Sequence, residues 1–334
     1  MAEARRHRPS LARDLAAAIR NGTRRPEADP DYADGDDSTW LSVDWPALTH
    51  RITVAGHELN YVDTGGEDKP PLVFIHGLGA SWQCWLLNLP SFMETHRCIA
   101  LDLPGFGESP LPEDEDVSID GYARLVDRLC AALDIEAPDV IGNSMGGFVG
   151  AELAISYPTR VQRLVLVSPA GITSEHLARR PLMTVARVAA MAEAGLASQL
   201  DQFVRRPRLR RLVLQAVVRY PEKLSGPLAW ELIHGSGRKG FLPALDALIG
   251  YSIRDRLPRI EIPVLLVWGR NDILVPVGDA ERYEELIGQN ARKVIFEDTG
   301  HVPMIERPSR FNPLVAEFLA GERAPGADVA GVSA

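Results

Sequence analysis

The sequence has few cysteines. Its 334 residues contain three, Cys84, Cys98 and Cys130, an odd number without the paired spacing that metal ligands show. Two of them lie in apolar surroundings. This usage predicts reduced thiols packed in the core of a cytosolic protein.

Long apolar runs and basic charge are also lacking. No stretch approaches the ~18 consecutive apolar residues of a membrane span. The N-terminus is rich in arginine but has no apolar block or cleavage site after it, so we expect no secretion and a cytoplasmic location. The net charge of −9 argues against nucleic acid as a general partner.

Cofactor fingerprints are missing as well. Gly105-Phe106-Gly107 lacks the third glycine and the acidic partner that a dinucleotide site needs, and no cluster of metal ligands is visible. We therefore expect no cofactor and no metal.

Apolar strands and helices alternate along most of the chain. A hairpin is predicted around Gly56-His57, from the alternation that begins at Thr49. Strand followed by helix then recurs, which predicts an α/β fold with a mostly parallel, doubly wound sheet. The predicted strands lie near 71–75, 97–101, 139–143, 162–168, 263–268 and 293–297, and the predicted helices near 118–133, 146–157, 279–288 and 309–319.

The N-terminal residues 1–45 form a basic arm and a disordered linker in our interpretation. Residues 10–20 can form an amphipathic helix, either loosely docked or in weak contact with an anionic membrane surface. Residues 24–38 are rich in Pro, Asp and Gly, which predicts the linker. Folded structure is expected from near Trp40, so removing residues 1–40 should leave the melting temperature nearly unchanged.

An insertion interrupts the alternation over residues 172–239, where helices are predicted at 181–200 and 209–220. Between Arg179 and Lys223 it holds ten Lys or Arg against three acids. That charge indicates either a solvated basic face or a site for an anionic lipid or substrate. We divide the rest into a core, 46–171 and 240–321, and a disordered tail, 322–334.

A Gly-x-Ser-x-Gly turn follows the strand that ends near residue 143. Its central residue is Ser144. Gly142 and Gly146 lie two positions away on either side, because bulkier side chains at those positions would collide in so tight a strand-to-helix turn. The turn predicts a nucleophilic serine, which needs a base and a group that orients the base.

Two later strand ends supply these groups. Asp272 follows the strand near 263–268, and His301 follows the strand near 293–297. Parallel sheets assemble sites at the carboxyl ends of their strands, so we expect Ser144, Asp272 and His301 to converge. Asp298 and Glu306 are nearby acids, but their positions indicate a loop cap and the start of a surface helix.

The motifs together resemble those of the α/β-hydrolase superfamily, over about residues 49–320. The resemblance implies Ser144 as nucleophile, His301 as general base and then acid, and Asp272 as the orienting acid. It also implies an oxyanion hole made by the backbone N–H groups of Leu78 and Met145. The matching segments are His-Gly at 76–77, Asp-x-Pro-Gly-x-Gly-x-Ser at 102–109, the Ser144 turn, Trp-Gly-Arg-Asn-Asp at 268–272 and Gly-His-Val-Pro-Met-Ile-Glu-Arg-Pro at 300–308.

Other residues near these motifs have weaker assignments. His76 is expected to hold the oxyanion loop, and Asp102 to hydrogen-bond the turn after it. Trp82 and Phe148 either line an acyl pocket or pack in the core. His234, at the end of the insertion, is a candidate for substrate contact.

The reaction implied is hydrolysis of a small-molecule carboxylic ester through an acyl-enzyme. A serine nucleophile argues against the haloalkane dehalogenase and epoxide hydrolase branches, which use a carboxylate. The serine hydrolases that cleave carbon–carbon bonds of vinylogous diketones are the main alternative, although they usually carry Trp where this chain has Val302. An acyltransferase, a cofactor-free haloperoxidase and a non-catalytic binding module are further alternatives, the last disfavoured by the complete triad. The sequence leaves the oligomeric state open.

Overall fold

The computed structural model describes residues 29–35, 37–112, 117–172, 206–234 and 239–321, and the chain divides into two units, Met1–Pro30 and Asp31–Ala334. In the first unit only Asp29 and Pro30 are described. The expected helix at 10–20, the helix at 181–200 and the tail at 322–334 lie outside the described residues.

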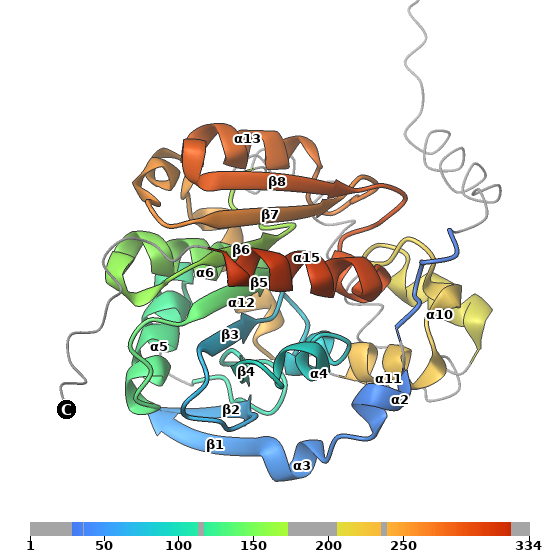
Figure 1. Ribbon diagram of the computed structural model, residues 1–334, viewed down its shortest axis with the longest axis horizontal. Helices are drawn as coiled ribbons and strands as arrows, with labels where there is room; N and C mark the ends of the chain where they lie inside the picture. The colour runs from blue at the N-terminus through green and yellow to red at the C-terminus, as the bar shows by residue number, and fades with distance from the viewer. Residues whose placement is uncertain (1–28, 36, 113–116, 173–205, 235–238, 322–334) are drawn as a thin grey trace, which may run out of the picture. The chain divides into compact units, whose positions relative to one another are not determined.

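The second unit is built on one eight-stranded sheet with the order β1-β2-β4-β3-β5-β6-β7-β8 (Figure 1). β2 is antiparallel to both of its neighbours, and every other pairing from β4 to β8 is parallel. The strands are β1 (Thr49–Val54), β2 (His57–Asp63), β3 (Pro71–Ile75), β4 (Arg97–Leu101), β5 (Asp139–Asn143), β6 (Leu164–Val167), β7 (Val264–Gly269) and β8 (Ala291–Phe296).

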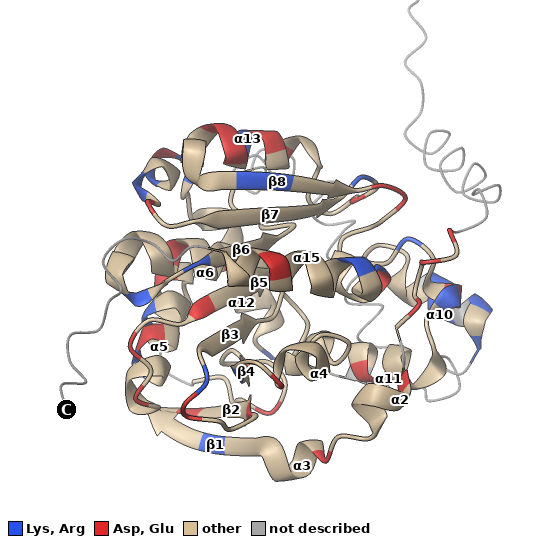
Figure 2. Ribbon diagram, viewed as in Figure 1, with Lys and Arg blue, Asp and Glu red and all other residues tan. Residues whose placement is uncertain are grey.

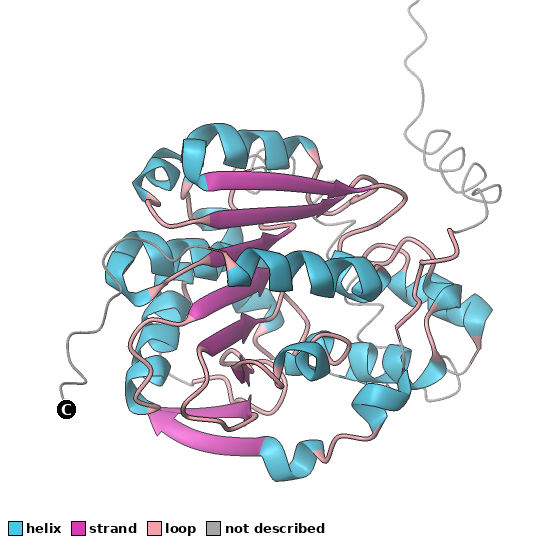
Figure 3. Cartoon of the chain, in the orientation of Figure 1, coloured by secondary structure: helices cyan, strands magenta, loops and turns pink. Residues whose placement is uncertain are grey.

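Helices cover both faces of this sheet (Figure 3). The α-helices are α2 (Asp37–Leu41), α3 (Trp45–Leu48), α4 (Leu89–Phe92), α5 (Ile119–Ala132), α6 (Met145–Ser156), α10 (Pro207–Leu214), α11 (Gly226–His234), α12 (Phe241–Gly250), α13 (Gly278–Ile287), α14 (Pro303–Glu306) and α15 (Pro308–Ala320). The 3-10 helices are η2 (Trp82–Trp85), η3 (Pro158–Arg160), η4 (Pro221–Lys223), η5 (Arg254–Arg259) and η6 (Gly288–Asn290).

The apolar strand β3 shows why both faces must be covered. Val73 and Ile75 belong to the hydrophobic cluster that includes the buried faces of α5, α6 and α13. Phe74, between them, points the other way, and its ring centroid lies 5.4 Å from that of Trp85 and 6.1 Å from that of Phe92. Successive side chains of a strand alternate between faces, so a strand apolar at every position is buried from both sides.

The predicted fold class and order of elements are confirmed. The hairpin, the six later strands and the four helices after them lie where the patterns indicate, with ends within about two residues, the usual uncertainty of such boundaries. The described residues between β6 and β7 form helices and no strand, as expected of the insertion. Within it, the helix expected over 209–220 is α10, which ends earlier, at Leu214. The division into a core, 46–171 and 240–321, and a helical cap formed by the insertion, 172–239, stays a prediction.

The three cysteines are free and buried, as the sequence indicated. Burial raises the pKa of both Cys98 and Cys130 to about 12, so these thiols stay protonated at neutral pH. Among the described residues, no helix has both the length and the apolar character to span a bilayer.

The start of the second unit differs from the disordered linker expected over 24–38. Tyr32 and Trp40 are 5% and 4% exposed, and the Trp40 indole donates to Asp37 Oδ1. The linker expectation is therefore wrong from Asp31 onward. Local composition rich in Pro, Asp and Gly is polar, but Tyr32 within it bonds to Glu306 and Tyr220, which are far away in the sequence.

Removing residues 1–40 is consequently expected to lower the melting temperature, not to leave it unchanged. Losing two buried aromatic side chains costs about 3 to 6 kcal/mol of unfolding free energy, from roughly 1.5 to 3 kcal/mol each. Thermal unfolding followed by circular dichroism measures the shift, and removal of residues 1–30 alone is the matched control. Equal melting temperatures for the two truncations would contradict the prediction.

Candidate active site

Ser144 lies in the turn between β5 and α6 with backbone angles of φ 55° and ψ −115°. This region is unfavourable for a residue with a side chain, so surrounding structure must hold it. Its N–H donates to Val167 O of β6, and its carbonyl accepts from the N–H groups of Phe148 and Ala170. The hydroxyl is thus offered at the carboxyl end of β5 by a backbone anchored on both sides.

The two glycines of this turn are required by close backbone contacts. A Cβ on Gly142 would lie 2.3 Å from Gly146 O, and a Cβ on Gly146 would lie 2.2 Å from Ile75 O. Both distances are far below van der Waals contact. The steric reason inferred for the Gly-x-Ser-x-Gly spacing is therefore present in the structure.

Asp272 and His301 form a hydrogen-bonded pair at the ends of β7 and β8. The distance from His301 Nδ1 to Asp272 Oδ2 is 2.7 Å, and both side chains are buried. A carboxylate only accepts, so Nδ1 carries the hydrogen, and in the neutral imidazole the lone pair is then on Nε2. The other carboxylate oxygen, Oδ1, accepts from the N–H groups of Leu274 and Val275, which fixes the orientation of the acid.

Asn143 connects the serine turn to the histidine loop. Its Nδ2 donates to Val167 O at 3.1 Å and to His301 O at 3.4 Å. A Cβ on Gly77 would lie 3.2 Å from Ser144 Cβ, so the loop after β3 approaches the same turn. Three loops that are distant in the sequence therefore meet at the turn that holds Asn143 and Ser144.

Sequence reasoning did not single out Asn143. The available signal was a polar residue that ends the strand, after Val140, Ile141 and Gly142 and directly before the serine.

The loop expected to form the oxyanion hole is held by His76. Leu103 N–H donates to His76 Nε2 at 3.0 Å, so Nδ1 carries the hydrogen and donates to Gly77 O at 2.7 Å. Burial lowers the pKa of His76, which favours this neutral form. Met145 is the first residue of α6, where N–H groups lack acceptors within the helix. The Leu78 and Met145 assignments themselves stay predictions.

Asp102 lies in a buried turn after β4 and holds three donors. Its carboxylate accepts from Asn60 Nδ2, Trp82 N–H and Glu108 N–H at 2.8 to 2.9 Å. The bond to Glu108 closes the turn that the sequence predicted.

Two of the three residues proposed for substrate contact, Trp82 and Phe148, are buried. Phe148 is fully buried, belongs to the hydrophobic cluster and lies 5.8 Å, ring centroid to ring centroid, from Tyr251. Trp82 is 6% exposed, with its ring centroid 5.2 Å from that of Trp45. These contacts favour the core-packing alternative for both. His234 ends α11, and its side chain is outside the described residues.

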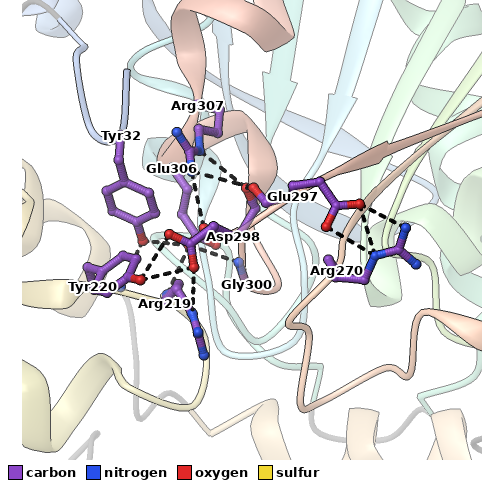
Figure 4. Close-up of polar contacts among 10 residues, drawn as sticks. Tyr32, Arg219, Tyr220, Arg270, Glu297, Asp298, Gly300, Glu306 and Arg307 are labelled. Atoms are coloured by element: carbon purple, nitrogen blue, oxygen red, sulfur yellow. Dashed lines mark hydrogen bonds and ion pairs between the residues drawn. The ribbon is translucent and has the colours of Figure 1, made fainter. Parts of the chain in front are cut away.

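The two rival acids are engaged elsewhere (Figure 4). Asp298 accepts from the Tyr220 hydroxyl and pairs with the Arg219 guanidinium, with Nε 3.2 Å from Oδ1. Glu306 was expected at the start of a surface helix, which is wrong, because it ends the short helix α14 and is fully buried. Asp272 is the acid bonded to His301.

The basic insertion is only partly a solvated face. Figure 2 shows Lys and Arg gathered on α10. Arg206, directly before this helix, and Arg208 within it are exposed. Arg210, however, is buried and donates to Leu224 O, and burial lowers its pKa. Arg179, Arg180, Arg187 and Arg205 lie outside the described residues. Within the described part of the chain, no group of three or more His, Cys, Asp and Glu side chains could hold a metal ion.

The chain is similar in sequence to known proteins. A family model described as alpha/beta hydrolase fold matches residues 70–308. The dihydrolipoyllysine-residue acetyltransferase component of the acetoin cleaving system of Cupriavidus necator is 33% identical over 281 residues, 80% of this chain and 68% of the relative.

Two further relatives and a solved structure are similar over most of the chain. The 2-hydroxymuconate semialdehyde hydrolase of a Pseudomonas species is 30% identical over 82% of this chain and 95% of its own. Monoacylglycerol lipase ABHD6 of Mus musculus is 28% identical over 75% and 76%, respectively. The structure of a meta-cleavage product hydrolase, CumD, superposes with a TM-score of 0.65 at 27% identity, covering 81% of this chain and 98% of that one.

Proposed function

This chain belongs to the α/β-hydrolase fold family, and from that premise we propose that it is a serine hydrolase that cleaves carboxylic esters through an acyl-enzyme. The observation that carries the proposal is the 2.7 Å bond between His301 Nδ1 and Asp272 Oδ2. It leaves Nε2 as the basic nitrogen, in a loop that Asn143 ties to the Ser144 turn.

The reaction follows from these groups in two halves. His301 Nε2 takes the proton of Ser144 as Oγ attacks the acyl carbon, and the backbone N–H groups of Leu78 and Met145 stabilise the oxyanion. The C–O bond of the ester breaks, and the alcohol leaves with the proton from His301. Water, deprotonated by His301, then attacks the acyl-enzyme, and the acid leaves as Ser144 regains its proton.

Asp272 takes no proton in this scheme. It keeps His301 in the tautomer with hydrogen on Nδ1 and stabilises the imidazolium that forms in each half. Its own orientation comes from the two backbone N–H groups bonded to Oδ1.

Carbon–carbon bond hydrolysis of a vinylogous diketone is the second candidate function. Its support is the 30% identity to a 2-hydroxymuconate semialdehyde hydrolase over 82% of the chain. Against it stands Val302 after the histidine, where those enzymes usually carry Trp. The monoacylglycerol lipase relative favours ester cleavage. Acyl transfer to an acceptor other than water would use the same acyl-enzyme.

The two candidates are separated by turnover of p-nitrophenyl esters from C2 to C16 at neutral pH. We expect hydrolysis with one optimum of chain length, because an acyl pocket of fixed depth binds one length best. A vinylogous 1,5-diketone is assayed in parallel by loss of its chromophore. Turnover of the diketone with none of any ester would replace ester hydrolysis by the second candidate.

A further inference from the structure

Glu306 is a buried acid that the proposed chemistry does not use, yet four donors from three parts of the chain point at it (Figure 4). Its side chain is inaccessible to solvent. Oε2 accepts from Gly300 N–H at 2.9 Å, Arg219 N–H at 2.9 Å and the Tyr32 hydroxyl at 2.5 Å, and Oε1 accepts from Val302 N–H at 3.2 Å.

Two of these donors flank His301. Gly300 and Val302 both donate to Glu306, and the N–H of His301 itself donates to Val217 O at 2.9 Å. Three consecutive N–H groups around the histidine are therefore fixed by acceptors outside the loop. The peptide planes on both sides of His301 set the direction in which its side chain leaves the backbone.

Gly300 lets this contact form. A Cβ at residue 300 would lie 2.9 Å from Glu306 Oε1 and 3.0 Å from both Arg219 N and Val217 O. At Gly300 the histidine loop thus packs onto the segment that follows α10, and the Glu306 carboxylate lies beside this contact.

The Glu306 carboxylate is also contacted by Tyr32, near the start of the second unit. The Tyr32 hydroxyl donates to Glu306 and accepts from Tyr220 N–H at 2.8 Å. The Arg307 guanidinium pairs with Asp31 and lies 5.0 Å from the Tyr32 ring centroid. Burial raises the pKa of Glu306, whereas its hydrogen-bond donors act in the opposite direction.

We propose that Glu306 is a positioning residue for His301, holding the loop backbone on both sides of the base while Asp272 orients the ring. The inference rests on the proposed function, in which His301 Nε2 must meet the Ser144 hydroxyl. Asp272 fixes only the ring nitrogen that it contacts. A displacement of the loop by about 1 Å would move Nε2 away from the serine, and misplacement on that scale lowers rates by roughly 100-fold.

The chemistry of the site calls for a carboxylate. All four partners are donors, and an ionised carboxylate accepts at both oxygens. A glutamine has the same shape but turns an NH₂ group toward at least one donor, so a bond is replaced by a repulsive contact. Glu306→Gln should therefore shift the loop with little change in volume.

The test measures how fast a fluorophosphonate probe labels Ser144, because this reaction needs an activated serine but no knowledge of the substrate. We expect Glu306→Gln to slow labelling by about 10- to 100-fold. With the best ester, kcat should fall by a similar factor while KM changes by no more than about twofold, because Glu306 touches no substrate. Melting temperatures verify that each variant is folded at the assay temperature.

Two matched variants separate positioning from stability. Glu297→Gln changes an exposed carboxylate of the same loop, paired with Arg270 at 2.8 Å, and should label at the wild-type rate. Tyr32→Phe removes a donor to Glu306 while both bonds to the histidine loop stay. It should lower the melting temperature but slow labelling by no more than about twofold, as expected for a change distant from the base.

Each outcome decides something. Wild-type labelling by folded Glu306→Gln overturns the positioning role alone. Equal slowing in Tyr32→Phe shows a stability effect and also overturns it. If the glutamine variant does not fold, Glu306→Asp is tested instead. Aspartate keeps the charge, but its shorter side chain moves the carboxylate oxygens away from the donors, so labelling is expected to slow. A wild-type labelling rate for this variant would refute the positioning role. Absence of Ser144-dependent labelling in the wild-type protein refutes the proposed function and this inference with it.

Discussion

Ser144→Ala is expected to lower ester turnover by about a million-fold, leaving only what binding and the oxyanion donors contribute. Without Oγ the acyl-enzyme of the proposed mechanism does not form. Alanine fits the same space, and its Cβ tolerates the 55° φ no worse than that of serine. The melting temperature should therefore stay close to that of the wild-type protein. Steady-state kinetics and thermal unfolding measure the two quantities.

Ser168→Ala is the matched control for this prediction. Ser168 directly follows the neighbouring strand β6, is fully buried and also has a positive φ, 45°. Its hydroxyl has no hydrogen-bond partner among the described residues. The variant should retain nearly full activity. Substantial turnover by Ser144→Ala would remove the nucleophile from the proposed mechanism.

Asp272→Asn is expected to reduce kcat by roughly 10,000-fold. An asparagine that turns its NH₂ toward His301 stabilises the tautomer with hydrogen on Nε2, and that nitrogen can no longer accept the serine proton. An asparagine oxygen at Oδ1 can still accept from Leu274 and Val275, so the loop should keep its shape. Measured kcat values across neutral pH report the loss.

Asp298→Asn provides the comparison, because Asp298 is the rival acid three residues before His301. It is bonded to Tyr220 and Arg219, so its loss should cost some stability and little activity. A large fall in kcat for Asp298→Asn, with Asp272→Asn nearly active, would reverse the assignment of the acid.

Much of the fold was predictable because its signals are local. The strands of the parallel sheet are short apolar runs, and the turn at Ser144 shows itself by glycines two positions away on either side. Asp272 and His301 were found by the same means, since each lies in the loop that follows a strand. The sequence could predict that they lie at one edge of the sheet, but not the 2.7 Å bond between them.

Features that depend on distant partners were missed or misassigned. Glu306 looked like the start of a surface helix because nothing within a few residues shows the donors that surround it. The helix expected to reach Tyr220 ends at Leu214, although its composition is helical. Val217 O accepts from His301 N–H and Arg219 N–H donates to Glu306 instead, and those bonds replace the helical ones.

The bond between Tyr32 and Glu306 also has a consequence for synthesis of the chain on the ribosome. The two residues are 274 positions apart. At about 5 to 20 residues per second, Tyr32 emerges roughly 14 to 55 seconds before its partner has been made. During that interval an aromatic side chain that is buried in the finished protein stays exposed to solvent. The nascent chain therefore exposes the Tyr32 ring to chaperones until α14, which carries Glu306, has been translated.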